Sequence, residues 1–370
     1  MKNETTQSPA ELVLPSADLA ADIAFFTAVG FRLDQILPAD NPQIARLSGH
    51  GLHLCIDCNA ECPPATIRLP IDAAPEGSRD SLTAPNGCTL LFGEQTRTLP
   101  TLANYPFEIR RLADATDQVT GRAGMLYRDL SPSRFGGKII ASHISIPLGG
   151  PVNDMVHYHE IEFQLIYCYK GWVKVVYEDQ GEPMILEPGD CVTQPPGIRH
   201  RVLESSDHLE VIEIGVPAMH MTNIDHELEL PTGDILPEKE FGGQTFCHHI
   251  ANEVPWLAEV GALFQSRETD VESASRGVAR VKALRPNEAY SSSQKKSEKP
   301  AWCKQQDDLT FFFVMEGELT LHTLGKEEET TTNQLVRCDA VTLPRGQQYR
   351  FAECSSDLML LEVTLVSRAA

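Results

Sequence analysis

From about Gly124 nearly to the C-terminus, the chain consists of many short segments rich in Val, Ile and Tyr, separated by Gly and Pro turns. Short strands at such spacing are typical of an all-β barrel or sandwich. This region also repeats itself, because His200–Glu204 matches Tyr349–Glu353 at a spacing of 149 residues, and Ser-Ser-Asp follows the first segment directly and the second after Cys354. Glu213 recurs as Glu362 at the same spacing. An internal repeat of this length predicts two barrels with one plan.

The N-terminal part of the chain has a different pattern. It predicts a helix that Ser16 or Asp18 can cap and that ends near Ala28, before Gly30. The strands expected around this helix are Glu11–Pro15, Phe31–Leu37, Ile44–Leu47 and Leu52–Ile56. This βαβββ order resembles the first half of a vicinal-oxygen-chelate (glyoxalase-like) domain, with a later hairpin at Pro85-Asn86-Gly87. Because no set of metal ligands is evident in it, we expect a degenerate module without catalytic function.

The composition excludes several classes of partner. Lys and Arg total 31 and Asp and Glu total 52, so the formal charge is −21 and the molecule repels polyanions. We therefore expect no nucleic acid and no membrane as partner. The polar first residues lack the pattern of a secretory signal, which predicts a cytoplasmic location. The ten cysteines lie mostly singly along the chain, as is typical of reduced thiols.

Histidines mark the earlier of the two predicted barrels. His157 and His159 are two residues apart, and a strand places alternate side chains on one face, so both imidazoles can reach one ion. Gln164 lies just beyond them. The turn Pro195-Pro196-Gly197 returns the chain so that His200 can enter from a neighbouring strand. Since three imidazoles favour transition metals over Mg or Ca, the pattern predicts a transition-metal site.

The spacing of these residues resembles the two motifs of the cupin superfamily. The first motif corresponds to His157-Tyr158-His159, four residues, Gln164, six residues and Gly171. The second corresponds to Gly189, five residues, Pro195, one residue, Gly197, two residues and His200. The sequence departs from the family pattern in having Gln164 where Glu is usual and Gly150 one residue farther from His157. The resemblance implies a jelly-roll barrel with a metal ion held by His157, His159, Gln164 and His200.

The role of Gln164 stays open at this point, because its amide oxygen can ligate the ion or hydrogen-bond a bound water. In either case the ligand set carries no charge, so an anionic substrate oxygen or hydroxide is drawn to the ion. We expect one divalent transition metal ion, with Fe(II) favoured and Zn, Ni or Mn as alternatives. The expected substrate is a small organic anion.

The second copy lacks these ligands. Alignment on Gly171 and Gly317 places Cys303, Gln305, Thr310 and Tyr349 at the positions of His157, His159, Gln164 and His200. We expect this barrel to keep the fold, to bind no metal and to serve packing and oligomerisation. The resemblance to bicupins implies a homodimer.

The predicted fold class is mainly β. Two cupin (double-stranded β-helix, jelly-roll) barrels follow a small α+β βαβββ module. The predicted domains are a glyoxalase-like module in residues 1–110, a metal-binding barrel in residues 111–230 and a second barrel in residues 231–370.

Two further residues belong only to the copy with the histidines. Arg199 corresponds to Gln348 and can orient a substrate carboxylate, although an exposed turn arginine is the simpler interpretation. His143 corresponds to Ala283 or Lys282. It can act as a general acid or base or support a ligand, and a hydrogen-bonded core histidine is the alternative. His143 and Arg199 are our candidate catalytic residues.

Two weaker metal patterns also occur. Cys55, Cys58 and Cys62, with Cys88 as a fourth thiolate, have part of a structural zinc signature, but its second cysteine pair is missing. His248-His249 is an isolated pair. We expect neither to bind a metal.

The resemblance implies a mononuclear metalloenzyme. Dioxygenation of a small oxygenated carboxylate is the leading expectation, since it is the commonest activity of metal-bearing bicupins. A redox-neutral lyase or isomerase acting on a sugar acid or keto acid is the main alternative, because some cupins of that class use a His-x-His, Gln, His set. A bicupin that binds a small molecule without turnover is the third.

Overall fold

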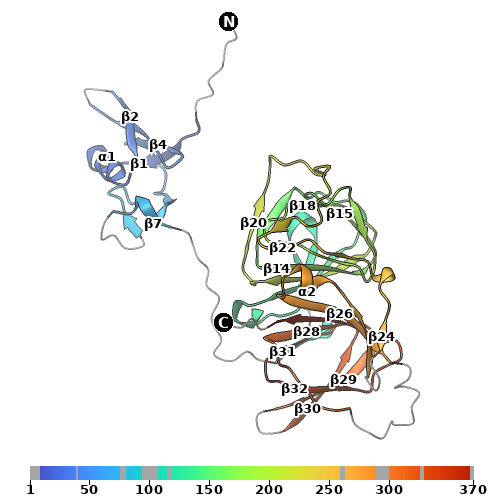
Figure 1. Cartoon of the computed structure of the whole chain (residues 1–370). Helices are drawn as coiled ribbons and strands as arrows, with labels where there is room; N and C mark the ends of the chain where they lie inside the picture. Colours follow the sequence, from blue (N-terminus) through green and yellow to red (C-terminus); the bar gives the residue numbers. More distant parts are fainter. Residues whose placement is uncertain are drawn as a thin grey trace. The chain divides into compact units, whose positions relative to one another are not determined.

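The protein is described here by a computed structural model. It describes residues 9–38, 41–75, 81–93, 107–114, 118–258, 263–287, 300–325 and 329–366. The chain divides into two compact units, Met1–Arg97 and Thr98–Ala370, and each is considered by itself (Figure 1). Within the described residues, no helix combines the length and the apolar character needed to span a membrane.

The first unit has the predicted strand and helix order. Its elements in chain order are β1 (Leu12–Pro15), α1 (Leu19–Ala28), β2 (Arg32–Leu37), β3 (Ile44–Gly49), β4 (Leu52–Asp57), β5 (Thr66–Leu69), β6 (Ser81–Thr83) and β7 (Thr89–Phe92). The first four strands form one sheet in the order β1-β4-β3-β2, and β5-β7-β6 form another. Asp18 is the residue that caps α1, because its side chain accepts a hydrogen bond from the Ala21 N–H. The glyoxalase-like identity of this unit stays a prediction.

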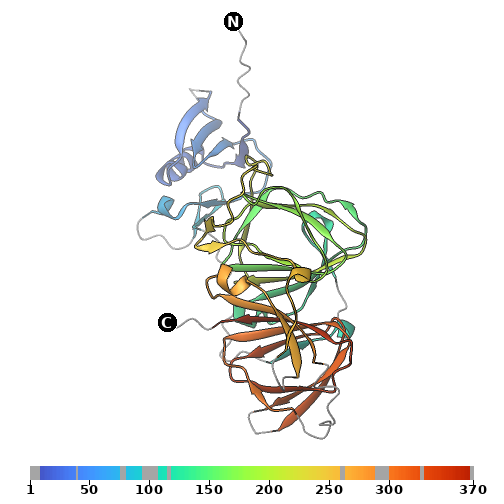
Figure 2. The same ribbon diagram turned by 45° about the vertical axis from the view of Figure 1, so that its right-hand side comes forward.

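The first barrel is built from two facing sheets. The larger has the order β23-β17-β14-β19-β11-β10-β9, and the smaller has β16-β15-β18-β13-β20 with β12 paired to β18. The strands of the larger sheet are β9 (Val119–Thr120), β10 (Leu126–Asp129), β11 (Ile140–Ile146), β14 (Phe163–Lys170), β17 (Cys191–Thr193), β19 (Leu209–Val216) and β23 (His248–His249). Those of the smaller are β12 (Gly150–Pro151), β13 (His157–Glu160), β15 (Val173–Tyr177), β16 (Met184–Leu186), β18 (His200–Ser205) and β20 (Met221–Ile224). Figure 2 shows these strands curving around a common interior.

The second barrel repeats this plan. Its larger sheet has the order β24-β25-β26-β33-β28-β31-β8 and its smaller sheet β27-β32-β29-β30. The strands of the larger sheet are β8 (Glu108–Arg110), β24 (Leu257–Ala258), β25 (Phe264–Glu268), β26 (Ala279–Pro286), β28 (Leu309–Glu316), β31 (Ala340–Pro344) and β33 (Met359–Leu365). Those of the smaller are β27 (Cys303–Lys304), β29 (Glu318–Leu324), β30 (Thr330–Val336) and β32 (Gln348–Ala352).

Several short elements connect these sheets. They are the hairpin β21 (Glu240–Phe241) and β22 (Gln244–Thr245), the helix α2 (Val271–Ala274) and the 3-10 turns Ile71–Ala73, Leu112–Asp114, Arg122–Gly124, Arg134–Gly137 and Ala251–Glu253. The mainly β fold with two jelly-roll barrels confirms the predicted fold class. The boundaries predicted at residues 110 and 230 stay predictions, although β8 and β23 each pair with the barrel on the other side of such a boundary.

One apolar core joins the two barrels. Buried side chains of β14 and β19 pack in the same cluster as those of β26, β28 and β33. Hydrogen bonds cross this contact, since the Tyr169 hydroxyl donates to the Met315 carbonyl at 2.8 Å and Nη2 of Arg128 donates to the Cys338 carbonyl at 2.8 Å. The larger sheets of the barrels are therefore packed against each other, while the interior of each barrel keeps a separate core.

Candidate metal centre

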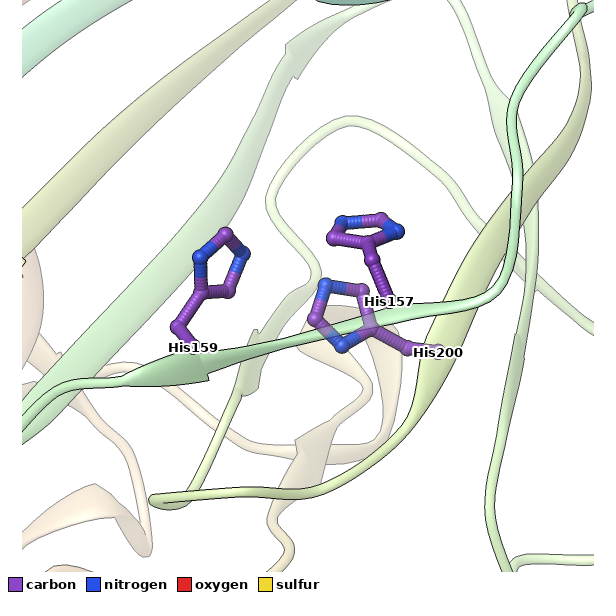
Figure 3. Close-up of side chains that lie close together, drawn as sticks. All are labelled: His157, His159 and His200. Atoms are coloured by element: carbon purple, nitrogen blue, oxygen red, sulfur yellow. The ribbon is translucent and has the colours of Figure 1, made fainter. Parts of the chain in front are cut away.

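Three histidines meet inside the first barrel (Figure 3). His157 and His159 come from β13, and His200 begins β18, directly opposite His157 in the antiparallel register. One ring nitrogen of each lies within 4.8 Å of those of the other two. The rings are buried, and their centroids are 4.2 Å apart for His157 and His200 and 5.2 Å apart for the other two pairs. The predicted two-residue spacing thus brings both β13 histidines to one face.

Hydrogen bonds fix which nitrogen of each ring is available. Nδ1 of His157 lies 2.8 Å from the Met155 carbonyl, and Nδ1 of His200 lies 3.0 Å from the Ile198 carbonyl. A carbonyl can only accept, so each Nδ1 carries the proton and each Nε2 keeps a lone pair. Nδ1 of His159 is 2.9 Å from the Thr222 hydroxyl. The Nε2 atom of His157 is buried without a hydrogen-bond partner among the described residues, as expected of an atom that binds a ligand.

Burial keeps these imidazoles neutral. It lowers the pKa of His159 to about 3 and the pKa of His200 well below its ordinary value, and the neighbouring histidines lower both further. Burial is also the main cause of the lowered pKa of His157, with the nearby Arg122 guanidinium second. Neutral imidazole is the form that binds a metal, so protons compete weakly for this site at neutral pH.

Gln164 presents its amide oxygen without a partner. On β14, its Nε2 donates a hydrogen bond of 2.7 Å to Oε1 of Glu213, while its Oε1 is buried and has no hydrogen-bond partner among the described residues. The β19 residue opposite Gln164 is Gly215. Glu213 therefore fixes the amide orientation so that the oxygen is the unpaired atom. Burial raises the pKa of Glu213, and the hydrogen bond from Gln164 opposes that shift.

A cavity opens beside the histidines. His159, His200, Gln164 and Glu213 line it together with aliphatic side chains from both sheets. Arg122, from the turn before β10, also lines it and pairs through Nη1 with Oδ1 of Asp154. Three imidazole nitrogens, one amide oxygen and open space beside them fit a divalent transition metal with room for a substrate.

The other predicted site residues lie elsewhere. His143 is on β11 directly before Ile144, which lines the cavity together with Ile146, so strand alternation turns His143 outward. It packs against Phe313 of the second barrel, and its Nε2 lies 2.8 Å from Oε2 of Glu210. The structure does not bring His143 to the histidine cluster, and its surroundings favour the alternative of a hydrogen-bonded core histidine. Its register counterpart in the second barrel is Ala283.

Arg199 also lies outside the cavity lining. Its Nε donates to Oδ2 of Asp225 at 3.1 Å, and its guanidinium stacks over the Tyr158 ring at 4.2 Å. Through these contacts, the Arg199 side chain links β13 to the residue that follows β20, on the outer side of the sheet. The structure therefore does not place Arg199 where it could orient a substrate beside the histidines.

The weaker metal patterns form no cluster. Within the described residues, the three histidines are the single group of His, Cys, Asp or Glu atoms close enough to hold a metal ion. Cys55, Cys58, Cys62, Cys88 and the His248-His249 pair all lie in described segments and do not form such a group.

Sequence reasoning missed Arg122, Asp154 and the present role of Glu213. Arg122 lies in a short turn between β9 and β10, in a segment without periodicity. Asp154 precedes His157 by three residues, and its buried carboxylate accepts hydrogen bonds from the Met155 and Val202 N–H groups. Glu213 recurs at the repeat spacing, which favoured a structural interpretation.

A cupin domain is identified by comparison with known families. Residues 143–215 match the model of the Cupin domain, and together with the two jelly-roll barrels this match supports the cupin superfamily. No match to the chain was found among curated proteins.

Among solved structures, the chain is similar to oxalate decarboxylase from Bacillus subtilis. The structure of that enzyme at pH 4.6 has 10% sequence identity, covers 74% of this chain and 79% of that chain, and has a TM-score of 0.50. A B. subtilis oxalate decarboxylase studied for its Mn(II) centres has 9% identity, coverage of 74% and 81%, and a TM-score of 0.50. A mutant of the same enzyme has 9% identity, the same coverage and a TM-score of 0.51. At such identity, the likeness concerns the fold.

Proposed function

We propose that the chain is a metal-dependent cupin enzyme that acts on a small oxygen-bearing carboxylate inside the first barrel. The observation that carries this proposal is the cluster of His157, His159 and His200, whose Nδ1 atoms are all engaged and whose free nitrogens lie close together. Gln164 completes the proposed ligand set through its unpaired Oε1. The solved neighbours act on oxalate by name, which supports a small carboxylate as substrate class.

Four neutral ligands define what the ion can be. Imidazole and amide donors suit Fe, Mn, Ni or Zn, and the Mn(II) centres of the neighbouring enzyme add weight to Mn beside Fe(II). A bound divalent ion would supply a Lewis acid for a substrate oxygen and, as Fe(II), a centre able to react with O2. The protein's own part is to orient the ligands through the Met155 and Ile198 carbonyls, to keep them neutral by burial and to exclude bulk water with an aliphatic wall.

Oxygenation of the substrate is the first candidate reaction. A redox-neutral lyase or isomerase reaction is the second, and Gln164 and Glu213 favour it. An uncharged ligand set leaves the full positive charge of the ion to polarise a carbonyl or hydroxyl. Glu213 lines the same cavity, and Oε2, its carboxylate oxygen not engaged by Gln164, can hold a proton removed from a substrate carbon.

Metal analysis and two assays test the proposal. Freshly purified protein should contain about one equivalent of a transition metal per chain by elemental analysis. Oxygen uptake by the Fe(II)-loaded protein with oxalate and a panel of keto- and hydroxyacids indicates oxygenation, whereas turnover without oxygen by the Mn, Ni or Zn form indicates redox-neutral chemistry. Saturable binding without either activity supports a non-catalytic binding protein. Equal metal content in wild type and His200→Ala would refute the site.

A further inference from the structure

The wall of the metal-site cavity is mostly aliphatic. Side chains from five elements of the first barrel form it, among them Met125, Ile144, Ile146, Val175, Val202 and Val211. Several are almost fully buried, so the wall is a continuous apolar surface. A substrate hydroxyl placed against such a wall loses its hydrogen bonds to water without replacement, at a cost of roughly 1–3 kcal/mol each.

Polar groups in the same wall are largely paired with each other. Nε2 of Gln194 donates to the Tyr177 hydroxyl at 2.9 Å, and Nε2 of Gln164 donates to Glu213 at 2.7 Å. The Tyr177 ring also stacks on His200, with centroids 5.5 Å apart, so its hydroxyl is held in place. Apart from Oε1 of Gln164, which we assign to the metal, and Oε2 of Glu213, these groups offer little to a polyhydroxylated ligand. The cavity therefore disfavours the sugar acids considered from sequence.

Arg122 is a charged residue in this mostly apolar lining, and part of its side chain is left unpaired by the residues that the structure describes. It is the one Lys or Arg among the described residues that lines the cavity, and its side chain is 34% exposed. Asp154 holds Nη1, and Asp154 is itself buried and fixed by backbone N–H groups. Within the described part of the chain, Nε and Nη2 of Arg122 have no protein acceptor, so one edge of a positioned guanidinium remains available. That planar edge matches a carboxylate in a bidentate contact.

The turn that carries Arg122 is built against the barrel. A Cβ atom at Gly121 would lie 2.5 Å from the Tyr127 ring, so only glycine lets the turn pack this closely. Nη1 of Arg122 is 3.5 Å from Nδ1 of His157, which places the guanidinium beside the cluster. Arg122 lines the same cavity as His159, His200 and Gln164, so an anion held there by its free edge can extend toward the proposed metal position.

We propose that Arg122 binds the carboxylate of a short aliphatic 2-oxo or 2-hydroxy acid, whose alkyl group packs on the cavity wall and whose second oxygen faces the histidines. This substrate class rests on the proposed function. The cavity lining supports it, because the aliphatic wall matches an alkyl group and the free guanidinium edge matches a carboxylate.

Binding of four defined acids to the metal-loaded wild type tests the alkyl part. Titration calorimetry without oxygen, on Zn(II)-loaded protein, compares glyoxylate, pyruvate, 2-oxobutanoate and 3-hydroxypyruvate. We expect affinity to rise about 3- to 4-fold for each carbon added from glyoxylate to 2-oxobutanoate. 3-Hydroxypyruvate has the same number of non-hydrogen atoms as 2-oxobutanoate and should bind more weakly. Equal or tighter binding of 3-hydroxypyruvate would overturn the aliphatic assignment.

Two variants test the carboxylate contact. Arg122→Ala should weaken 2-oxobutanoate binding by about 10- to 100-fold, as expected for a lost charge-assisted bidentate contact, while metal content stays at the wild-type level. Arg122→Lys keeps the positive charge but cannot make the bidentate contact. Its affinity for 2-oxobutanoate should lie between those of wild type and Arg122→Ala. Arg280→Ala, which removes an arginine of the second barrel that is also paired with an aspartate, is the matched control and should bind as wild type.

The outcomes separate this inference from the proposed function. Unchanged 2-oxobutanoate affinity in Arg122→Ala, with normal metal content, overturns the role of Arg122 alone. Failure of the wild-type protein to retain any metal overturns the proposed function. In that case, the ratio of the 2-oxobutanoate affinities of Arg122→Ala and wild type still decides the role of Arg122.

Discussion

The two barrels use the same positions for different purposes. In the first, His157 lies opposite His200 across β13 and β18; in the second, Cys303 lies opposite Tyr349 across β27 and β32. The register of the strands is the same, so the change is confined to side chains. The two barrels thus keep the same strand pairing with different side chains at the positions of the proposed ligands.

Polar interior groups differ in the same way. Gln164 faces Gly215 and leaves its Oε1 unpaired, whereas at the equivalent place Thr310 and Thr364 hydrogen-bond each other at 2.9 Å. Glu213 lies opposite Ser142. Its counterpart Glu362 lies opposite Lys282, and the two side chains form an ion pair at 3.3 Å. The second barrel pairs these groups internally, whereas in the first barrel Oε1 of Gln164 stays without a partner among the described residues.

The largest expected difference between the barrels concerns metal retention. His200→Ala should lower metal affinity by at least about 100-fold, because loss of a ligand exceeds the effect of losing a supporting contact. Tyr349→Ala, at the same register position of the second barrel, should leave metal content unchanged. Elemental analysis and chelator competition measure both. Loss of metal in Tyr349→Ala but not in His200→Ala would reverse the assignment of the two barrels.

A smaller difference should separate the paired glutamates. Glu213→Ala removes the acceptor that orients Gln164, so we expect about a 10- to 100-fold loss of metal affinity. Glu213→Gln retains an acceptor oxygen and should lose less. The matched control is Glu362→Ala, which should not change metal affinity because its partner is Lys282. Equal affinities of Glu213→Ala and wild type would show that Gln164 needs no orientation by Glu213.

The smallest expected effect concerns His143 and Glu210, near the contact between the barrels. It should change the free energy of unfolding. The hydrogen bond from His143 is the main cause that lowers the pKa of Glu210. As the pH falls, the unfolded chain takes up this proton before the folded one does. The stabilisation is therefore present above about pH 4.5, the ordinary value, and is lost as the pH falls through the lower folded-state pKa.

Glu210→Gln should accordingly lower the free energy of unfolding by about 1–2 kcal/mol at pH 7. The difference from wild type should shrink below pH 4.5, and metal content should not change. Urea denaturation of the full chain over this pH range measures it. Glu316→Gln removes an exposed carboxylate of the second barrel and is the control. A loss of metal in Glu210→Gln would instead return His143 and Glu210 to the site.

The sequence was sufficient for the architecture, because strand period, Gly and Pro turns and the repeat all indicate two barrels. It was also sufficient to bring His157, His159 and His200 together, since ligand spacing on strands is a local property. His143 and Arg199 were chosen because they occur only in the copy with the histidines. That criterion did not indicate their positions, because strand alternation turns His143 outward and Asp225 binds the Arg199 side chain. Spacing does not report which face of a strand lines a cavity.

Residues contributed by tertiary packing could not be predicted. Arg122 reaches the cavity because Gly121 lets its turn pack on Tyr127, a contact that no periodic pattern encodes. Glu213 recurs in both copies, and recurrence alone suggests a structural residue. Glu213 lies opposite Ser142, whereas its counterpart Glu362 lies opposite Lys282, and this difference gives the two glutamates different roles. The cross-strand neighbours are known only once the pairing of the strands is known.

The apolar core shared by the barrels has an evolutionary consequence. A gene shortened to the half with the histidines would encode a protein whose Phe135 and Tyr169 lose their cover and whose Arg128 loses the Cys338 carbonyl. Such a truncation is therefore expected to expose an apolar sheet face, which favours retention of both copies in one gene.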